Sequence, residues 1–519
     1  MKISDTKILL LVVLAAFFIL YSSVSLLYPT AFGDEGFYAA NTRWIAENMK
    51  LPVYEPMRGT EIYHEKIVIP PLYEVTQAGM WLLGGETGMK LLIPVFSIIA
   101  AAMLYLFLKR TGRPKAGLIA AIIFLAIPSL VTYSVLNYTD TFLTLMFICA
   151  AYFGYVALEE NDKKNTVIAG IFSGLGFLAK GSGFLVLVMI IFYFLLSRKY
   201  KSLKNFKTLL IIIAISGIII VPWFARSLIL YNAVCYHPLL MNGCDPVTDV
   251  TIPKVEGLEF AGRLDTTGTE ASVWDIGLLN YFNFALGWVV LMLVVFGITG
   301  MFVKKKTNLM LISLILVFIP VFFMSNTNIF GAAARAEDTA RYTLPMVLAL
   351  AAIAGIFLED IFDAVKKYNK VLAIGIIALL LVSPLIVMQQ KLETMKGVKS
   401  FSEGFFNGCD WIKKNTPTDS IIFSVYAHHT AYFCDRMSVR YLPDSEEIQI
   451  SNNDTAYEHL KLHGIDYVYI QAFTISDKPY SEVTTLDFLN YLNSSDKFEK
   501  ILDNTNVYGN SGVILYKVL

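Results

Sequence analysis

Long apolar runs recur along the chain from the N-terminus to about residue 388, separated by polar segments. Each run has roughly 15–25 residues, and a helix needs about 20 to cross the hydrocarbon core of a bilayer. The runs lie near 8–28, 90–108, 116–134, 141–158, 165–180, 184–197, 208–225, 279–303, 308–325, 343–358 and 371–388. The pattern predicts a polytopic α-helical membrane protein with about 11 transmembrane helices, in a domain covering residues 1–390.

Basic residues gather in one set of the predicted loops, which marks the cytoplasmic side of a membrane protein. Lys2 and Lys7 precede the first run, which lacks a convincing small-residue cleavage site, so we expect a retained anchor rather than a signal peptide. The basic loops are 109–115, 163–164, 198–207, 304–306 and 366–370, and the opposite, longer and more acidic loops are 29–89, 226–278 and 326–341. We expect a multi-pass protein of the cell (plasma) membrane with a cytoplasmic N-terminus.

The tail, residues 395–519, is polar and mixed in character. Helix patterns alternate there with short strand patterns, which is typical of an α/β domain. The expected helices are 407–414, 454–463 and 484–493, and the expected strands are 420–426, 466–471 and 512–518. Alternation of the spans places this predicted α/β domain on the extracytoplasmic side.

Composition agrees with a membrane protein, because 56% of the residues are hydrophobic and 16% are charged, against about a quarter charged in soluble domains. The formal net charge is zero, so nothing points to a nucleic-acid partner, and membrane lipids are the expected surroundings. Cys235 and Cys244 share one outer loop, and Cys409 and Cys434 share the tail. Two local disulfides and four free thiols are both compatible with this spacing.

Two acidic sites stand at predicted outer ends of membrane helices. Asp34 and Glu35 follow the first run directly, and Asp140 begins the fourth. Each could be an ordinary helix N-terminal residue, since carboxylates are favourable there. Ionisable groups at membrane depth are costly and tend to be functional, so a shared cavity for Asp34 and Asp140 is the alternative.

Lys180 follows a run of about 15 residues, or roughly 22 Å of helix, which is shorter than the hydrocarbon core of about 30 Å. Its ammonium group is therefore expected inside the membrane profile, where it needs an anion or a water-filled cavity. A lipid phosphate would serve, and snorkelling to the interface is the structural alternative.

Further outer cations could bind phosphate, since arginine does so bidentately; these are Arg226 and Arg341. His64, Glu65 and His237 have the donor types of a mixed nitrogen and oxygen metal site, so a divalent cation is a possible cofactor. Their alternative is a set of ordinary polar loop residues.

These residues, in this order, resemble the GT-C superfamily of integral membrane glycosyltransferases, and especially the protein O-mannosyltransferase and lipid A aminoarabinose transferase group. The similarity covers nearly the whole chain. The matching features are Asp34-Glu35, Pro70-Pro71-Leu72-Tyr73, Asp140 after Tyr133-Ser134, Gly174 to Gly181 with Lys180, Pro222-Trp223, and Arg341-Tyr342 with Pro345. The family often has a lysine directly before the Pro-Pro pair; here Ile69 holds that position, and Lys66, further back, is the candidate donor-phosphate ligand.

The resemblance implies a donor such as a dolichyl- or undecaprenyl-phosphate sugar, and an extracytoplasmic protein, lipid or glycan as acceptor. Asp34 would act as base, with Glu35 or Asp140 orienting the acceptor, raising the pKa of the base or holding a metal. Lys180 with Arg226 or Arg341 would stabilise the departing phosphate, and direct displacement would invert the anomeric centre. Tyr38, Tyr73 and Tyr138 are expected to line the substrate cavity.

Two other classes of protein share some of these features. A polytopic transporter or lipid flippase would also have many spans and buried charge, although no corresponding pair of broken helices appears in the two halves. A non-catalytic scaffold with a partner-binding tail is the other alternative.

Overall fold

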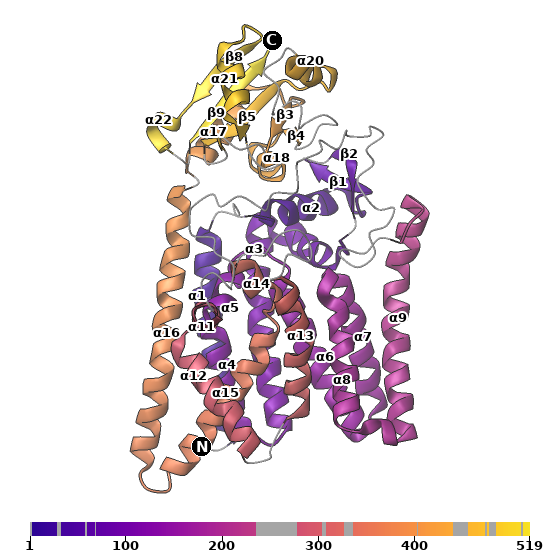
Figure 1. The fold of residues 1–519 in the computed structure, drawn as a ribbon, viewed down its shortest axis with the longest axis vertical. Helices are drawn as coiled ribbons and strands as arrows, with labels where there is room; N and C mark the ends of the chain where they lie inside the picture. Colours follow the sequence, from indigo (N-terminus) through magenta and orange to yellow (C-terminus); the bar gives the residue numbers. More distant parts are fainter. Residues whose placement is uncertain are drawn as a thin grey trace.

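The structure is a computed structural model, and a bundle of apolar helices with a small α/β unit at one end makes up its fold (Figure 1). It describes residues 3–28, 33–57, 60–67, 69–234, 278–303, 308–325, 336–401, 403–439, 455–472, 475–476, 484–509 and 512–519. The N-terminus lies at the end of the bundle opposite the α/β unit. The expected mostly helical architecture is therefore present.

Five helices in the described residues are long and apolar enough to cross a membrane, and one bent pair of helices meets the same criteria only when the two are taken together. The five spans lie in α1 (Ile3–Leu27), α3 (Leu72–Arg110), α6 (Asp140–Glu160), α9 (Leu203–Tyr231) and α16 (Lys370–Phe401), and the bent pair is α11 (Leu278–Leu286) and α12 (Trp288–Val303). The remaining bundle helices are α4 (Pro114–Ala126), α7 (Lys163–Ala179), α8 (Leu185–Leu196), α13 (Leu309–Ser325) and α15 (Met346–Val365). Lengths and composition thus support several spans without fixing the expected number of about 11.

Two of the expected runs are not single straight helices. The run at 116–134 divides into α4 and α5 (Pro128–Tyr133), because Ile127 before the proline has an extended backbone. Proline removes an amide donor and disfavours helical geometry in the residue before it. The run at 279–303 bends by 106° between α11 and α12, at Gly287. A hydropathy pattern detects the apolar length of such segments but not the break.

The long first loop is itself structured. It contains the helix α2 (Glu35–Asn48) and an antiparallel hairpin of β1 (Tyr54–Met57) and β2 (Thr60–Lys66). The helix α3 begins at Leu72, about five turns before the expected run at 90–108, and bends at Gly84 and Gly85, where the dihedral angles are not helical. The first part of α3 packs against α2, so these two helices form the floor beneath the C-terminal unit (Figure 1).

The C-terminal unit, residues 403–519, contains a mixed five-stranded sheet of order β4-β3-β5-β9-β8, with β4, β3 and β5 parallel and the other pairs antiparallel. Its strands are β3 (Ile421–Ser424), β4 (Met437–Val439), β5 (Tyr467–Gln471), β8 (Phe498–Asp503) and β9 (Val513–Val518). Its helices are α17 (Glu403–Asn415), α18 (Ala427–Cys434), α20 (Thr455–Leu462), α21 (Leu486–Ser494) and α22 (Thr505–Tyr508). Tyr467 and Tyr469 face α17 while Val468 and Ile470 face α20 and α21, as the two-residue period of a strand requires.

Two devices join α17 to α18. Cys409 and Cys434 form a disulfide, whereas Cys235 and Cys244 lie outside the described residues. The buried guanidinium of Arg436 donates to the carbonyl oxygens of Lys413 and Thr416, at 2.9 and 2.8 Å. The guanidinium thus caps the C-terminal end of α17, where backbone carbonyl oxygens otherwise lack hydrogen-bond donors. The disulfide therefore links the two helices covalently, and Arg436, two residues after α18, adds hydrogen bonds to the end of α17.

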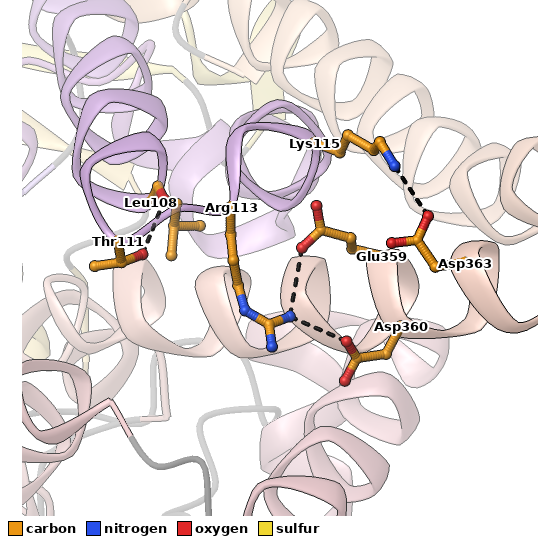
Figure 2. Close-up of polar contacts among 7 residues, drawn as sticks. All are labelled: Leu108, Thr111, Arg113, Lys115, Glu359, Asp360 and Asp363. Atoms are coloured by element: carbon orange, nitrogen blue, oxygen red, sulfur yellow. Dashed lines mark hydrogen bonds and ion pairs between the residues drawn. The ribbon is translucent and has the colours of Figure 1, made fainter. Parts of the chain in front are cut away.

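The opposite end of the bundle carries ion pairs between helix ends. Figure 2 shows the guanidinium of Arg113 between Glu359 and Asp360, at 3.4 and 3.0 Å, and the ammonium of Lys115 2.9 Å from Asp363. These pairs join the start of α4 to the end of α15, whose apolar faces are in extensive contact. One of the predicted basic loops, 109–115, thus pairs with the acidic end of α15.

Replacing Arg113 by Ala is expected to destabilise the protein by about 1–2 kcal/mol, because Glu359 is largely buried and would lose a charged partner. The matched variant Lys115→Ala removes a pair that is half-exposed on both sides, and we expect a loss below about 0.5 kcal/mol. Thermal unfolding of the detergent-purified protein measures both. Equal losses would contradict the assigned importance of the Arg113 cluster.

Candidate active site

Four charged side chains from distant parts of the chain meet at the end of the bundle beneath the C-terminal unit. Arg341, in α14 (Ala336–Tyr342), lies 2.8 Å from Asp34 and donates from Nε to Asp140 at 2.9 Å. Lys180, between α7 and a 3-10 turn, reaches the other oxygen of Asp140 at 2.5 Å. The resulting chain of ion pairs runs from Asp34 through Arg341 and Asp140 to Lys180.

The four side chains in this series of ion pairs differ sharply in burial. The side chains of Asp140, Arg341 and Lys180 are 1%, 8% and 13% exposed, whereas that of Asp34 is 46% exposed. Two cations and two carboxylates compensate one another, as buried charges must. Asp34 is therefore the member that a molecule arriving from outside can reach.

The neighbouring carboxylates Asp34 and Glu35 point to different environments. Glu35 is fully buried and accepts a hydrogen bond from the backbone amide of Asn137 at 2.6 Å. Gly33, just before the pair, has a φ of +48°, and a Cβ there would lie 2.4 Å from the hydroxyl of Tyr138. Glycine is required for both reasons. This geometry turns Asp34 toward Arg341 and Glu35 into the protein.

Asn137 connects Glu35 to a buried polar network. Its side-chain oxygen accepts from the Tyr73 hydroxyl at 2.8 Å and from the Gln77 amide at 2.6 Å, and Thr42 donates to Gln77 at 3.0 Å. This network fixes the segment 134–139, which leads into Asp140 at the start of α6. Asn137 also begins a glycosylation sequon, but the residue is 1% exposed and its side chain is engaged in packing.

The three tyrosines expected to line the substrate cavity are buried and lie together. Tyr38 makes edge-to-face contacts with Tyr73 and Tyr138, with ring centroids 5.5 and 6.2 Å apart. The guanidinium of Arg341 lies 4.2 Å from the ring centroid of Tyr138. Burial raises the pKa of Tyr138 well above its ordinary value, so its phenol stays neutral. These three rings pack together beside the charged cluster, and Tyr138 contacts Arg341.

Arg226 lies in different surroundings from the cluster. Its guanidinium donates to the carbonyl oxygen of Pro52 and lies 5.1 Å from the ring centroid of Trp223, on α9. The side chains of His64, Glu65 and Lys66 and all of His237 lie outside the described residues. Within the described residues, no group of three or more metal-ligating side chains could hold an ion.

Three residues that shape the site were not predicted from the sequence. Gly33, Asn137 and Gln77 shape the site without carrying a charge, and no local pattern marks them. The sequon at Asn137 is a pattern for glycosylation and does not indicate a role in this site. A glycine between an apolar run and two carboxylates is the one available signal, and it is weak.

Comparison with known proteins gives a family match for part of the chain. The model of a family described as dolichyl-phosphate-mannose-protein mannosyltransferase matches residues 69–225, which include Asp140 and Lys180. A search of the curated proteins found no match.

Solved structures with the same fold cover most of the chain. ArnT from Cupriavidus metallidurans bound to undecaprenyl phosphate has a TM-score of 0.63 at 12% identity, over 98% of this chain and 97% of that one. The apo oligosaccharyltransferase of Archaeoglobus fulgidus has a TM-score of 0.62 at 14% identity, over 89% and 69%. The archaeal AglB with an inhibitory peptide and a dolichol-phosphate has a TM-score of 0.60, also at 14% identity, over 88% and 69%. At identities this low, the structural similarity establishes the fold alone.

Proposed function

We propose that this chain, a membrane glycosyltransferase of the GT-C superfamily, transfers a sugar from a polyprenyl-phosphate carrier to an acceptor on the extracytoplasmic side. The observation that carries the proposal is the charged cluster of Asp34, Arg341, Asp140 and Lys180 at one end of apolar helices. It offers one reachable carboxylate beside two cations, and such a site suits an acceptor that loses a proton and a leaving group that gains negative charge.

Asp34 would act as the base. An acceptor hydroxyl is a poor nucleophile at neutral pH, and a carboxylate within hydrogen-bond reach removes its proton as attack begins. Arg341 holds one oxygen of Asp34 at 2.8 Å, which fixes the direction of the carboxylate. The half-exposed side chain remains within reach of an acceptor.

Lys180 and Arg341 would stabilise the departing phosphate. As the bond between the anomeric carbon and the carrier oxygen breaks, its electron pair stays with the phosphate, while the acceptor oxygen bonds to the carbon. Cations fixed in a water-poor site stabilise such charge more strongly than cations in water do. Asp140 holds both cations, so it acts by positioning them. Attack opposite the leaving group inverts the anomeric centre.

Two of the structures with this fold were solved with polyprenyl phosphates, namely undecaprenyl phosphate in ArnT and dolichol-phosphate in AglB. Their ligands support a lipid-linked donor for this chain. The acceptor would be a protein, lipid or glycan. A transporter or lipid flippase, the alternative function, has no such support from the family match and the shared fold.

Sugar release from a radiolabelled polyprenyl-phosphate donor in proteoliposomes tests this function. We expect label to leave the lipid phase and appear in an acceptor that mass spectrometry identifies. Movement of intact donor between leaflets without consumption would instead establish a transporter. A protein that neither moves nor consumes donor would be a scaffold, and either outcome overturns the proposal.

A further inference from the structure

The C-terminal unit contacts the helix that carries the two adjacent carboxylates. A Cβ built on Gly36, at the start of α2, would lie 2.8 Å from Cγ and Nδ1 of His429 and 2.9 Å from its Cδ2. His429 belongs to α18 and is buried. Its imidazole ring therefore rests directly on the backbone of Gly36, two residues after Asp34, and any side chain at position 36 would push it away.

Contacts continue along the same two helices. The rings of Phe37 and His428 lie 5.3 Å apart, and His428 pairs with Glu55 of the β1 strand at 2.9 Å. Further along α2, Arg43 pairs with Asp435 at 3.1 Å. Positions 36, 39 and 43 of α2 are spaced as one helix face, and α18 covers this face over its length.

The helix α2 needs such a partner. It has 14 residues, and the side chain of its N-cap residue, Asp34, makes no capping hydrogen bond to the helix. Isolated helices of about 12–15 residues are marginal in water, so packing on both faces must hold this one. One face packs on α3, and α18 supplies the other. The disulfide and the hydrogen bonds of Arg436, just after α18, hold α18 against α17 on that side.

We infer that α18 positions the base of the proposed glycosyl transfer: His429, seated on Gly36, fixes the N-terminal end of α2 and so directs Asp34 toward Arg341. His429 and Gly36 are positioning residues, and neither touches substrate. The inference rests on the proposed function for the role of Asp34. It makes the C-terminal unit necessary for turnover whichever acceptor is used.

A compensating pair of substitutions tests this contact. Gly36→Ala is expected to lower kcat by about 10–100-fold, because a small misplacement of a catalytic group has effects of this size. Donor Kd should stay within about threefold, since Lys180 lies on other elements. When His429→Ala is also present, the methyl group of Ala at position 36 has room. The double variant should therefore have the same kcat as His429→Ala alone, to within about threefold.

The control is Gly79→Ala in α3, where a Cβ would meet nothing within 4 Å. It should keep wild-type kcat. Hydrogen exchange of the α2 amides in the full-length protein gives a second readout that needs no activity: exchange should be faster in Gly36→Ala than in the double variant. Wild-type turnover by Gly36→Ala, or no recovery in the double variant, overturns the inference. A wild-type protein that leaves the donor intact overturns the proposed function, and the exchange data then still decide whether His429 holds α2.

Discussion

Replacing Asp34 by Asn is expected to lower kcat by about 10²–10⁴-fold, the contribution typical of a general base. Asparagine has the same size and can still accept a hydrogen bond from Arg341, but it cannot take the proton of an acceptor hydroxyl. Donor Kd should change by less than about threefold, because the two cations remain in place. Single-turnover rates at saturating donor, with binding measured separately, give the two quantities.

Glu35→Gln is the matched control for this variant. Its side-chain carbonyl can still accept the hydrogen bond from the Asn137 amide, so we expect kcat to fall by less than about tenfold. If both substitutions reduced kcat equally, the separation of a reachable base from a buried anchor would be wrong. Full turnover by Asp34→Asn would remove the base assignment altogether.

Replacing Lys180 by Ala is expected to weaken donor binding by about 30-fold or more, which corresponds to about 2 kcal/mol for the loss of a largely buried charged partner. The ammonium lies 5.1 Å from the ring centroid of Tyr342 and pairs with Asp140, so it is already ordered before any phosphate binds. Titration with a polyprenyl-phosphate sugar measures the change in Kd.

Lys180→Arg keeps the charge and should bind donor more tightly than Lys180→Ala does. Lys50→Ala, which removes an ammonium above Trp44 on α2, should leave donor Kd unchanged. Unaltered donor affinity in Lys180→Ala would show that the phosphate binds elsewhere, with Arg226 as the next residue to test.

Much of the helical architecture could be predicted, because a long apolar run is the sequence signature of a helix that can cross a membrane. The same holds for the tail, where α17, β3, α20, β5, α21 and β9 lie within a few residues of the expected elements. The break before Pro128 and the bend at Gly287 could not be predicted, since hydropathy measures apolar length and not direction. Proline and glycine mark such places, but both residues also occur inside continuous helices, as Pro222 does in α9.

The charged members of the cluster could be found from sequence because charge is expensive in an apolar segment. Their pairing could not, since Asp140 and Arg341 are 201 residues apart. The sequence predicts that Arg341 binds the donor phosphate, but it does not reveal the pairing of Arg341 with two carboxylates. The seat of His429 on Gly36 depends on a contact across nearly 400 residues, which no local pattern reports.

Electrical balance in the cluster has a kinetic consequence. Two cations and two carboxylates cancel while the site is empty, so a bound phosphate makes it negative. The proposed donor is a phosphodiester with one negative charge, whereas the spent carrier would be a monoester with a charge of about −1.5 to −2 near neutral pH. Lys180 and Arg341 should then hold the spent lipid more tightly than the fresh one. Release of the spent carrier into the bilayer, rather than sugar transfer itself, would then limit the rate of multiple turnover.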